Sequence, residues 1–443
     1  MATGKEIARR IFRQTLASID IPRVMERKLL HEGSRLILPD AVIGLSQTAK
    51  VHVVAIGKAA HAMVMGLESI LPAGTRVSGI VVAPVAPERR VPGMEYFVGG
   101  HPVPNAESWK SAEAILRLLE SCDERSVVIF LLSGGGSALV ELPLYDEMQL
   151  EDVQAVHRAL VTCGAPIEAM NTVRKHLSAV KGGRLAAAAG RARKITLAVT
   201  DVPAGKESAL ASGPTLPDPG TIADVGRIVA QYDLRRRFPE RLVRWLDAGK
   251  MPETPKAGDA AFANAYFHVL LGLDDLFHAA HHAAEACGYA TCCDNSTDDW
   301  PVAKAADALL VQLEEWQRMN EGQRVAIIAD GELSSPVTGN GVGGRNSAFV
   351  LDVAGKIAGQ RITVLSAGTD GIDGNSPAAG AVANGETVQR AKAAGLDPAA
   401  AFRESDAYTF FAKLDDAIVT GPTGNNLRDL RIMLAEESSR GPI

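Results

Sequence analysis

The chain has 443 residues, enough for two or three domains with sizeable cores. Hydrophobic residues make up 47% of it and charged residues 22%, proportions that are ordinary for a folded globular protein and argue against disorder. The net charge of −6 argues against a protein that binds nucleic acid, since such proteins usually carry a basic excess. A small anionic substrate remains compatible with this charge, because a few local cations can bind it.

The cysteines and the amino terminus indicate a cytoplasmic protein. The five cysteines are odd in number and include the vicinal pair Cys292 and Cys293, which lacks the spacing of a metal knuckle, so we expect reduced thiols. The first residues predict an amphipathic helix without a secretory signal, and no apolar stretch is long enough to span a bilayer. We therefore expect no membrane partner. The oligomeric state stays open, with a homodimer as one candidate.

Residues 5–37 carry apolar positions at helical spacing, which predicts one or two helices. The strand predicted at Val51–Ile56 runs directly into a helix start, so Lys58 lies at the carboxyl end of a strand, where open α/β sheets bind ligands. Lys58 is not a Walker lysine, because Ala59 follows it in place of serine or threonine. An exposed lysine in a first helical turn is the alternative.

A second strand is predicted at residues 78–83, followed by a turn-rich connection. Within this connection we interpret His101 as a structural turn residue, with a catalytic histidine as the alternative. Asn105 is well placed to cap a helix that extends through Leu119.

The most informative stretch is an apolar run at Val127–Leu132 that leads into small residues. The run predicts an interior strand. The loop at its carboxyl end consists of Ser133, Gly134, Gly135, Gly136 and Ser137. Three glycines allow a sharp turn and let backbone N–H groups approach a ligand, and a helix starting near Ser137 would add its own unpaired N–H groups. The stretch predicts an anion site, with a tight turn that binds nothing as the alternative.

The helix predicted from Ile167 to Val180 carries basic residues. Arg174 and Lys181 are seven positions apart, so they would share one helix face and could grip a carboxylate or phosphate together. A solvated basic face is the alternative. The strand predicted at residues 194–200 ends in Asp201, a candidate base or metal ligand.

A polar, proline-containing segment at residues 250–260 is the best candidate for a linker. Beyond it, a strand at residues 266–271 and a helix at residues 274–288 begin a new α/β alternation. We therefore predict two domains, at residues 1–255 and 256–443.

The predicted second domain contains another glycine-rich loop. It follows a strand at residues 324–330 and carries Glu332 near its start and Arg345 near its end. Its glycines match G-x-G-x-x-G formally, but the spacing from the strand is wrong for a dinucleotide fingerprint. The loop is more typical of one that wraps phosphates and presents Arg345.

Two aspartates follow the next predicted strand, at residues 361–366. Asp370 and Asp373 lie among glycines at its carboxyl end and could hold a hard cation, with structural Asx-turns as the alternative. A last strand at residues 417–420 precedes a small polar loop that runs to Asn426.

Six predicted strands are thus followed by loops that are rich in polar residues or glycine. Such loops lie at one edge of an open α/β sheet, so two facing domains would bring them around a single cleft. The predicted fold class is therefore α/β, with a Rossmann-like amino-terminal domain, a smaller α/β domain and an interdomain cleft.

At this point the chain resembles the type-2 glycerate kinase family, whose carboxyl-terminal module is called MOFRL. The resemblance extends from about Val51 to Leu434. Its marks are Leu132–Leu139, Asn171–Ser178 with Lys181–Arg184, Ala211–Thr215, Gly343–Asn346, Gly368–Gly374 and Thr420–Gly424. The resemblance implies two α/β domains and a kinase that uses ATP to phosphorylate D-glycerate at its 2-hydroxyl. It also implies that Lys58 and Arg345 are central to the chemistry.

The residues and the resemblance together predict phosphoryl transfer, in which a protein mainly positions reactants and neutralises charge. Lys58 and Arg345 would stabilise the moving phosphoryl group, and Asp201 would orient or deprotonate the hydroxyl. The predicted Mg²⁺ ligands are Glu332, Asp370 and Asp373. The predicted substrate- and phosphate-binding residues are Ser133, Gly134, Gly135, Gly136, Ser137, Arg174, Lys181 and Asn346.

Two other functions stay open from the sequence. A reductase of hydroxypyruvate that uses NAD(P)H would need a proper dinucleotide fingerprint, which is lacking. A non-catalytic homologue that binds a small anion would explain departures from the family pattern near Asp201 and Pro377.

Overall fold

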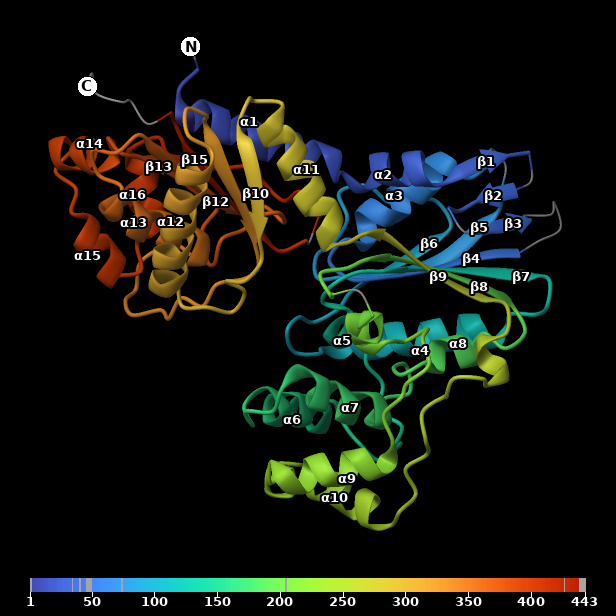
Figure 1. The fold of residues 1–443 in the computed structure, drawn as a ribbon. Helices are drawn as coiled ribbons and strands as arrows, with labels where there is room; N and C mark the ends of the chain where they lie inside the picture. The colour runs from blue at the N-terminus through green and yellow to red at the C-terminus, as the bar shows by residue number, and fades with distance from the viewer. Residues whose placement is uncertain are drawn as a thin grey trace. The chain divides into compact units, whose positions relative to one another are not determined.

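The computed structural model describes residues 2–33, 35–39, 41–44, 50–72, 75–203, 205–425 and 427–437. These residues form two compact α/β units, as predicted (Figure 1). The amino-terminal unit is Ile21–Gly272, and the carboxyl-terminal unit combines Met1–Asp20 with Leu273–Ile443. Asn426, at the end of the last predicted loop, lies outside the described residues.

The amino-terminal unit is built on a six-stranded parallel sheet. In spatial order its strands are β6 (Met94–Val98), β5 (Val77–Ala83), β4 (Lys50–Ile56), β7 (Ser126–Leu132), β8 (Arg193–Val199) and β9 (Ala265–Leu271). Counted along the chain this order is 3-2-1-4-5-6, which is that of doubly wound dinucleotide-binding folds. Every residue of β7 is buried, as its apolar sequence predicts.

Helices cover both faces of this sheet (Figure 1). One face carries α2 (Ile21–Lys28) and α3 (Ala60–Ile70), and the other carries α4 (Ala106–Glu120), α5 (Gly136–Leu139) and α8 (Arg184–Ala188). Asn105 caps α4 as predicted, since its side chain accepts a hydrogen bond of 2.8 Å from the Ser108 amide.

Further helices of this unit form a layer with a core of its own (Figure 1). They are α6 (Leu150–Val161), α7 (Ile167–Leu177), α9 (Ile222–Gln231) and α10 (Glu240–Asp247), with the short helices η1 (Glu207–Ser212), η2 (Leu234–Arg236) and η3 (Ala260–Phe262) between elements of the unit. A small antiparallel sheet contains β1 (Leu30–Glu32), β2 (Arg35–Ile37) and β3 (Val42–Gly44).

The carboxyl-terminal unit contains a mixed six-stranded sheet. Its strands, in spatial order, are β10 (Ala290–Asp294), β11 (Val325–Asp330), β15 (Asp429–Ala435), β12 (Ile362–Gly368), β13 (Gly380–Asn384) and β14 (Ala417–Ile418). The pair β10 and β11 is parallel, and the other neighbours are antiparallel. The strand β15 is buried throughout and joins β11 to β12.

Two sets of helices enclose this second sheet. The helices α12 (Val302–Met319), α13 (Arg345–Lys356) and α16 (Ala407–Lys413) form the core of one face, with α14 (Thr387–Ala393) and α15 (Pro398–Arg403) beside them. The helices α1 (Gly4–Ser18) and α11 (Leu273–Glu285) pack together against the sheet. No helix in the described part of the chain has the length and apolar character needed to cross a membrane.

The two units do not divide where the polar linker suggested. The strand β9 lies beyond residue 255 but pairs with β8 as the sixth strand of the first sheet. Its backbone N–H and C=O groups need that ladder, so the division in the structure falls after Gly272. The first helix joins the carboxyl-terminal unit, where Lys5 Nζ lies 2.7 Å from Asp416 Oδ2.

The helix α1 should therefore be part of the core of the carboxyl-terminal unit, whose other residues begin at Leu273. Replacing Ile11, whose side chain is 0% exposed, with alanine should lower the free energy of unfolding by about 2–4 kcal/mol. Urea denaturation followed by circular dichroism measures this loss. The exposed Arg13→Ala variant is the control, and an equal, small effect of both variants would contradict the packing of α1.

Candidate functional site

Two predicted loops meet at the centre of the parallel sheet. Lys58 follows β4 and the loop Ser133–Ser137 follows β7, and these neighbouring strands are the pair between which the strand order reverses. Ligands of open α/β sheets bind outside the carboxyl ends of the strands at this position. The Lys58 amide donates a hydrogen bond of 2.9 Å to the Gly134 carbonyl. The structure thus brings Lys58 and the glycine loop together within one unit.

Glycine is required where the two loops touch. Gly57 has a φ of +131°, and a Cβ built there would lie 2.1 Å from Ser133 Oγ. Gly135 has a φ of +87°, and its Cβ would lie 3.1 Å from His101 Cδ2. A side chain at either position would push the loops apart, so the glycines permit a close backbone approach.

The backbone amides of the glycine loop are unpaired. Within the described residues, no hydrogen bond engages the N–H groups of Gly134, Gly135 or Gly136, although Gly134 and Gly136 are buried. Buried amides almost always find an acceptor, so these groups indicate a place for a ligand oxygen. The helix predicted from Ser137 is the single turn α5, and its dipole adds little to this site.

A line of polar contacts connects the glycine loop to Arg174. Ser137 Oγ lies 2.7 Å from Ser212 Oγ, which is 3.4 Å from Asn171 Oδ1. Arg174 Nη1 donates to the same Asn171 oxygen at 3.4 Å. Arg174 therefore lies close to the loop, as expected of a group that holds the same ligand. Ser212 and Asn171 were not predicted as site residues, although both lie in the sequence motifs of the family resemblance.

Lys181 does not share a helix face with Arg174, and this prediction was wrong. The helix α7 ends at Leu177, and the extended Ser178 forms a β-bridge with Pro143. Lys181 is 1% exposed, and its ammonium group contacts Glu141 Oε2 at 2.5 Å. Its charge balances a buried carboxylate, so Lys181 is not available to a substrate in this structure.

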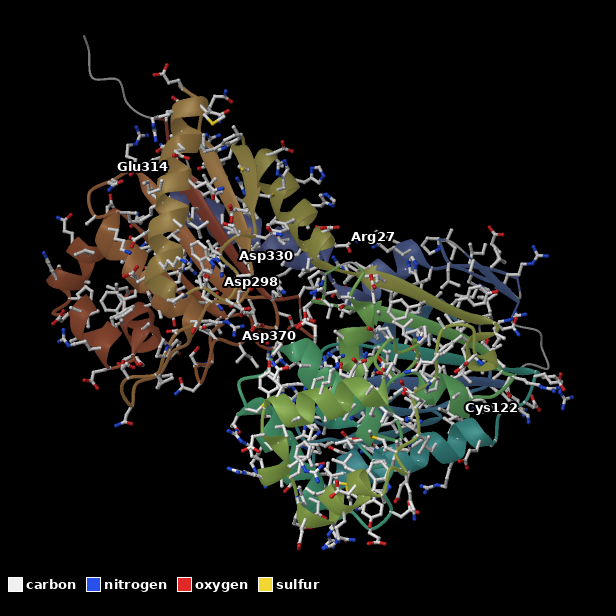
Figure 2. All side chains as sticks on the ribbon, turned by 60° about the horizontal axis from the view of Figure 1, so that its bottom comes forward. Arg27, Cys122, Asp298, Glu314, Asp330 and Asp370 are labelled. Carbon is white, nitrogen blue, oxygen red and sulfur yellow. The ribbon has the colours of Figure 1, made fainter. Side chains whose placement is uncertain are left out.

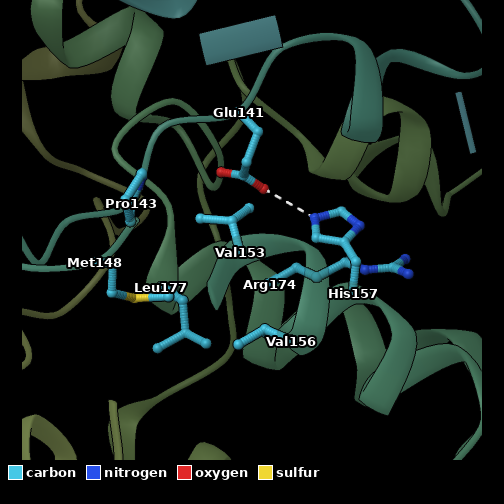
Figure 3. Close-up of a pocket in the computed structure, with 8 residues that line it drawn as sticks. All are labelled: Glu141, Pro143, Met148, Val153, Val156, His157, Arg174 and Leu177. Carbon is cyan, nitrogen blue, oxygen red and sulfur yellow. Dashed lines mark hydrogen bonds and ion pairs between the residues drawn. The ribbon is translucent and has the colours of Figure 1, made fainter. Parts of the chain in front are cut away.

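Glu141 sits at the centre of a buried ionic cluster. It also accepts from His157 Nε2 at 3.2 Å, as Figure 3 shows. Burial alone would raise the pKa of Glu141, but the charges and hydrogen bonds of Lys181 and His157 lower it to about 2. A buried pair of this kind is costly to break, because removing one partner leaves the other charge uncompensated.

A small cavity lies beside this cluster, with Glu141, His157 and Arg174 among its lining residues (Figure 3). Its volume of about 20 Å³ admits a single water molecule and no metabolite. In the part of the chain that the structure describes, Glu141 Oε1 and Arg174 Nε have no hydrogen-bond partner. The cavity is therefore part of the buried packing around Arg174 and is not a binding site for substrate.

Asp201 lies beyond β8, the neighbour of β7. It is partly exposed, and the turn that holds it is fixed by a 3.0 Å hydrogen bond from the Val202 amide to Thr200 Oγ1. Asp201 is thus at the same edge of the sheet as the glycine loop.

In the carboxyl-terminal unit, Arg345 is held between two carboxylates. Its Nε donates to Asp429 Oδ2 at 2.5 Å, and its Nη1 lies 2.9 Å from Glu332 Oε2. Burial would lower the pKa of Arg345, but the hydrogen bond and charge of the buried Asp429, with those of Glu332, raise it. The structure therefore brings the predicted Arg345 and Glu332 together. Asp429, in the unpredicted strand β15, fixes the orientation of the guanidinium.

Asp373 caps a helix. Its Oδ1 accepts from the Asn346 amide at 2.9 Å, and its Oδ2 accepts from the Ser347 amide at 2.9 Å and from Ser347 Oγ at 2.6 Å. These bonds engage both carboxylate oxygens with the amino terminus of α13. Asn346 is buried, and its Oδ1 accepts from Ser366 Oγ. Both residues thus hold the start of α13, which is the position of Arg345.

The predicted metal ligands do not form a cluster. Asp370 accepts from the Ile372 amide at 3.0 Å, which is the Asx-turn named as its alternative. In the described ranges, no group of three or more histidine, cysteine, aspartate or glutamate side chains is arranged to hold a metal ion.

Comparisons with known proteins fit this geometry. The family described as "Domain of unknown function (DUF4147)" matches residues 7–247, and the MOFRL family matches residues 325–429. The D-glycerate 2-kinase of Thermotoga maritima is 34% identical, over 87% of this chain and 90% of its own length. The chain belongs to the type-2 glycerate kinase family.

Other members of the family extend the likeness over nearly the whole chain. An Agrobacterium vitis protein named "Putative hydroxypyruvate reductase" is 35% identical over 98% of this chain and 94% of its own length. The crystal structure of Thermotoga maritima glycerate kinase has a TM-score of 0.83 at 32% identity, and covers 97% of this chain and 99% of that one.

Asp330 is a buried carboxylate that was not predicted as a site residue from the sequence. Asp330, labelled in Figure 2, ends β11 and is 1% exposed, yet among the described residues neither of its carboxylate oxygens has a hydrogen-bond partner. The nearby Arg431 donates to the backbone carbonyls of Asp330 and Gly331 instead. Burial, opposed by the charges of Arg428 and Arg431, raises the pKa of Asp330 to about 6. Its position at the carboxyl end of a predicted strand was the sequence signal that could have identified it as a candidate site residue.

Asp330 should make the protein less stable as the pH rises. Its folded pKa of about 6 exceeds the ordinary 3.8, so the folded state binds a proton more tightly and loses that advantage between pH 4 and 6. Asp330→Asn should therefore raise the free energy of unfolding at pH 7.5 by roughly 1–3 kcal/mol and raise it clearly less at pH 4.5.

Thermal unfolding of both proteins at the two pH values measures this difference. The exposed Asp307→Asn variant is the control for loss of a carboxylate in the same unit. A stabilisation by Asp330→Asn that is equal at both pH values would contradict the assigned titration.

Proposed function

We propose that the protein is an ATP-dependent kinase that phosphorylates D-glycerate, or a related small hydroxy acid, at the 2-hydroxyl. The observation that carries this proposal is the set of unpaired amides at Gly134, Gly135 and Gly136, next to Lys58 at the switch point of the parallel sheet. Amides and a lysine at such a position suit a carboxylate or phosphate. The relatives named as glycerate 2-kinases support the same choice of substrate.

The residues of the amino-terminal unit divide into binding and orienting groups. The glycine-loop amides, with Ser133 and Ser137, bind the anionic group, and Arg174 adds a positive charge through its position beside Asn171. Lys58 neutralises charge on the phosphoryl group in transfer. Asp201 lies at the same sheet edge and orients the acceptor hydroxyl.

Arg345 supplies the second cation in this proposal. A guanidinium gripped by Asp429 and Glu332 is held in one orientation before any ligand binds. Fixed charges of this kind lower the barrier because they need no reorganisation during the reaction. Asn346, the second residue of α13, accepts a hydrogen bond from Ser366 Oγ, and this contact helps to fix the helix start that carries Arg345.

Magnesium is proposed as the companion of ATP. Mg²⁺ in kinases is held by one or two carboxylates, by the nucleotide phosphates and by water, so a three-carboxylate cluster is not required. The carboxylate of Asp330, which no other described residue engages, fits such an ion, and Glu332 and Asp370 lie in the loops that follow β11 and β12 in the same unit. Asp373 fits less well, because both of its oxygens are engaged. When bound, the ion would neutralise charge on the phosphates.

A nicotinamide-dependent hydroxypyruvate reductase is the rival function. The strand order of the amino-terminal unit would permit a dinucleotide, but the turn after β4 reads Gly57-Lys58-Ala59-Ala60 and lacks the G-x-G-x-x-G fingerprint. The glycines at residues 339–344 precede α13 in a different unit.

We also propose a cytoplasmic location, because all five cysteines are free thiols.

The purified protein should release ADP when it is incubated with D-glycerate and MgATP, and a coupled enzyme assay measures this release. ³¹P NMR should identify the product as 2-phosphoglycerate. It should not oxidise NADH in the presence of hydroxypyruvate. Arg345→Ala should lower kcat by about 10²–10³, because it removes a fixed charge in the transition state. Arg345→Lys should recover little, since lysine cannot make the same forked contacts.

The exposed Arg318→Ala variant is the control for loss of an arginine in the carboxyl-terminal unit. NADH oxidation without ADP release would replace the kinase with the reductase. Tight binding of D-glycerate with neither activity would favour a non-catalytic homologue.

A further inference from the structure

His101 faces the glycine loop, although it lies after a different strand. A Cβ built on Gly135 would lie 3.3 Å from His101 Nε2 and 3.4 Å from Lys58 Cγ. The imidazole, the lysine stem and the glycine backbone therefore converge on one point. An oxygen bound to the loop amides would lie within reach of His101 Nε2.

The connection that carries His101 is fixed to the same body as the loop. A Cβ on Gly99 would lie 2.5 Å from the Leu139 carbonyl oxygen, so the two segments are in close contact. The Gly100 amide donates to Ser108 Oγ at 2.9 Å, and the Ser108 carbonyl accepts from the Glu141 amide at 3.3 Å. The position of His101 against Gly135 thus follows from packing and from the start of α4.

The imidazole of His101 has no competing partner. Among the residues that the structure describes, neither of its nitrogens makes a hydrogen bond, and the ring remains accessible to solvent. Partial burial, and then the positive charge of Lys58, lower the pKa of His101 below its usual 6.5. Lys58 is the one charged group that acts on it in the described part of the chain. A neutral imidazole with a free nitrogen is suited to accept a proton.

We propose that His101 is the general base of the phosphoryl transfer; this inference rests on the proposed kinase function. As the acceptor oxygen forms its bond to the γ-phosphorus of ATP, its proton passes to His101 Nε2. The bond between the γ-phosphorus and the β,γ-bridging oxygen breaks, and ADP leaves with that electron pair. The proton on His101 then passes to water.

His101 suits this task better than its neighbours. Lys58 carries the charge that the transferred phosphoryl group needs, and giving up that charge would remove its stabilising effect. Asp201 lies beyond β8, and within the described residues no hydrogen bond connects its carboxylate to the glycine loop. His101 is a proton acceptor whose Nε2 lies, with the Lys58 stem, beside the position that a Cβ on Gly135 would occupy.

Steady-state kinetics of His101→Gln and His101→Ala test this role. Removal of a general base should lower kcat by about 10²–10⁴ and leave KM for D-glycerate and MgATP within about threefold. In the wild type, kcat/KM should fall at low pH with a slope of one, below an apparent pKa under 6.5, and His101→Gln should lack this limb. Added imidazole should partly restore His101→Ala.

The control is His31→Gln, which removes an exposed histidine of the small antiparallel sheet and should retain wild-type kinetics. Retention of the acidic limb, or a kcat within threefold of wild type in His101→Gln, would overturn the inference while leaving the kinase intact. A wild-type protein that phosphorylates no hydroxy acid would instead overturn the proposed function.

NMR titration of the His101 ring tests the same idea without turnover. Its C2 proton should titrate below pH 6.5 in the wild type, and Lys58→Met should move the midpoint upward because the neighbouring charge is gone. An unchanged midpoint in Lys58→Met would show that the two side chains do not meet at the loop, and would overturn the inference.

Discussion

The site depends on the contact between two turns at the centre of the parallel sheet. The turn after β4 presses Gly57 against Ser133, and the Lys58 amide is bonded to the Gly134 carbonyl. This contact uses the carbonyl of the glycine loop and leaves the loop amides without acceptors. Any side chain at Gly57 would separate the turns, so one steric constraint both positions Lys58 and keeps the amides open to a ligand.

The charged residues of the two units divide between structural support and chemistry. Glu141 and Lys181 neutralise each other inside the amino-terminal unit, and Asp373 satisfies the amino terminus of α13. Asp330 is the opposite case, because no described residue forms a hydrogen bond with its buried carboxylate, which costs stability at neutral pH. Proteins retain such costs chiefly at functional positions, where stability is exchanged for a group that a ligand can use.

The sequence was most informative where one local signal determined the outcome. The apolar run of β7, the glycines after it and the cap at Asn105 are each specified by neighbouring residues, and all were predicted. The buried β15 was missed because the charged residues Asp429 and Arg431 are atypical of a central strand. Asp429 is paired with Arg345, and Arg431 donates to backbone carbonyls, and both contacts are tertiary. Lys181 was misplaced because the end of α7 is set by the bridge between Ser178 and Pro143, which is distant in sequence.

The central claim is that the amides of the glycine loop bind the anionic group of the substrate. A crystal structure with D-glycerate and a non-hydrolysable ATP analogue tests it most directly. The account predicts a carboxylate or phosphate oxygen within about 3 Å of the amide nitrogens of Gly134–Gly136, with Lys58 beside it. Both ligands bound elsewhere, with these amides still unpaired, would contradict it.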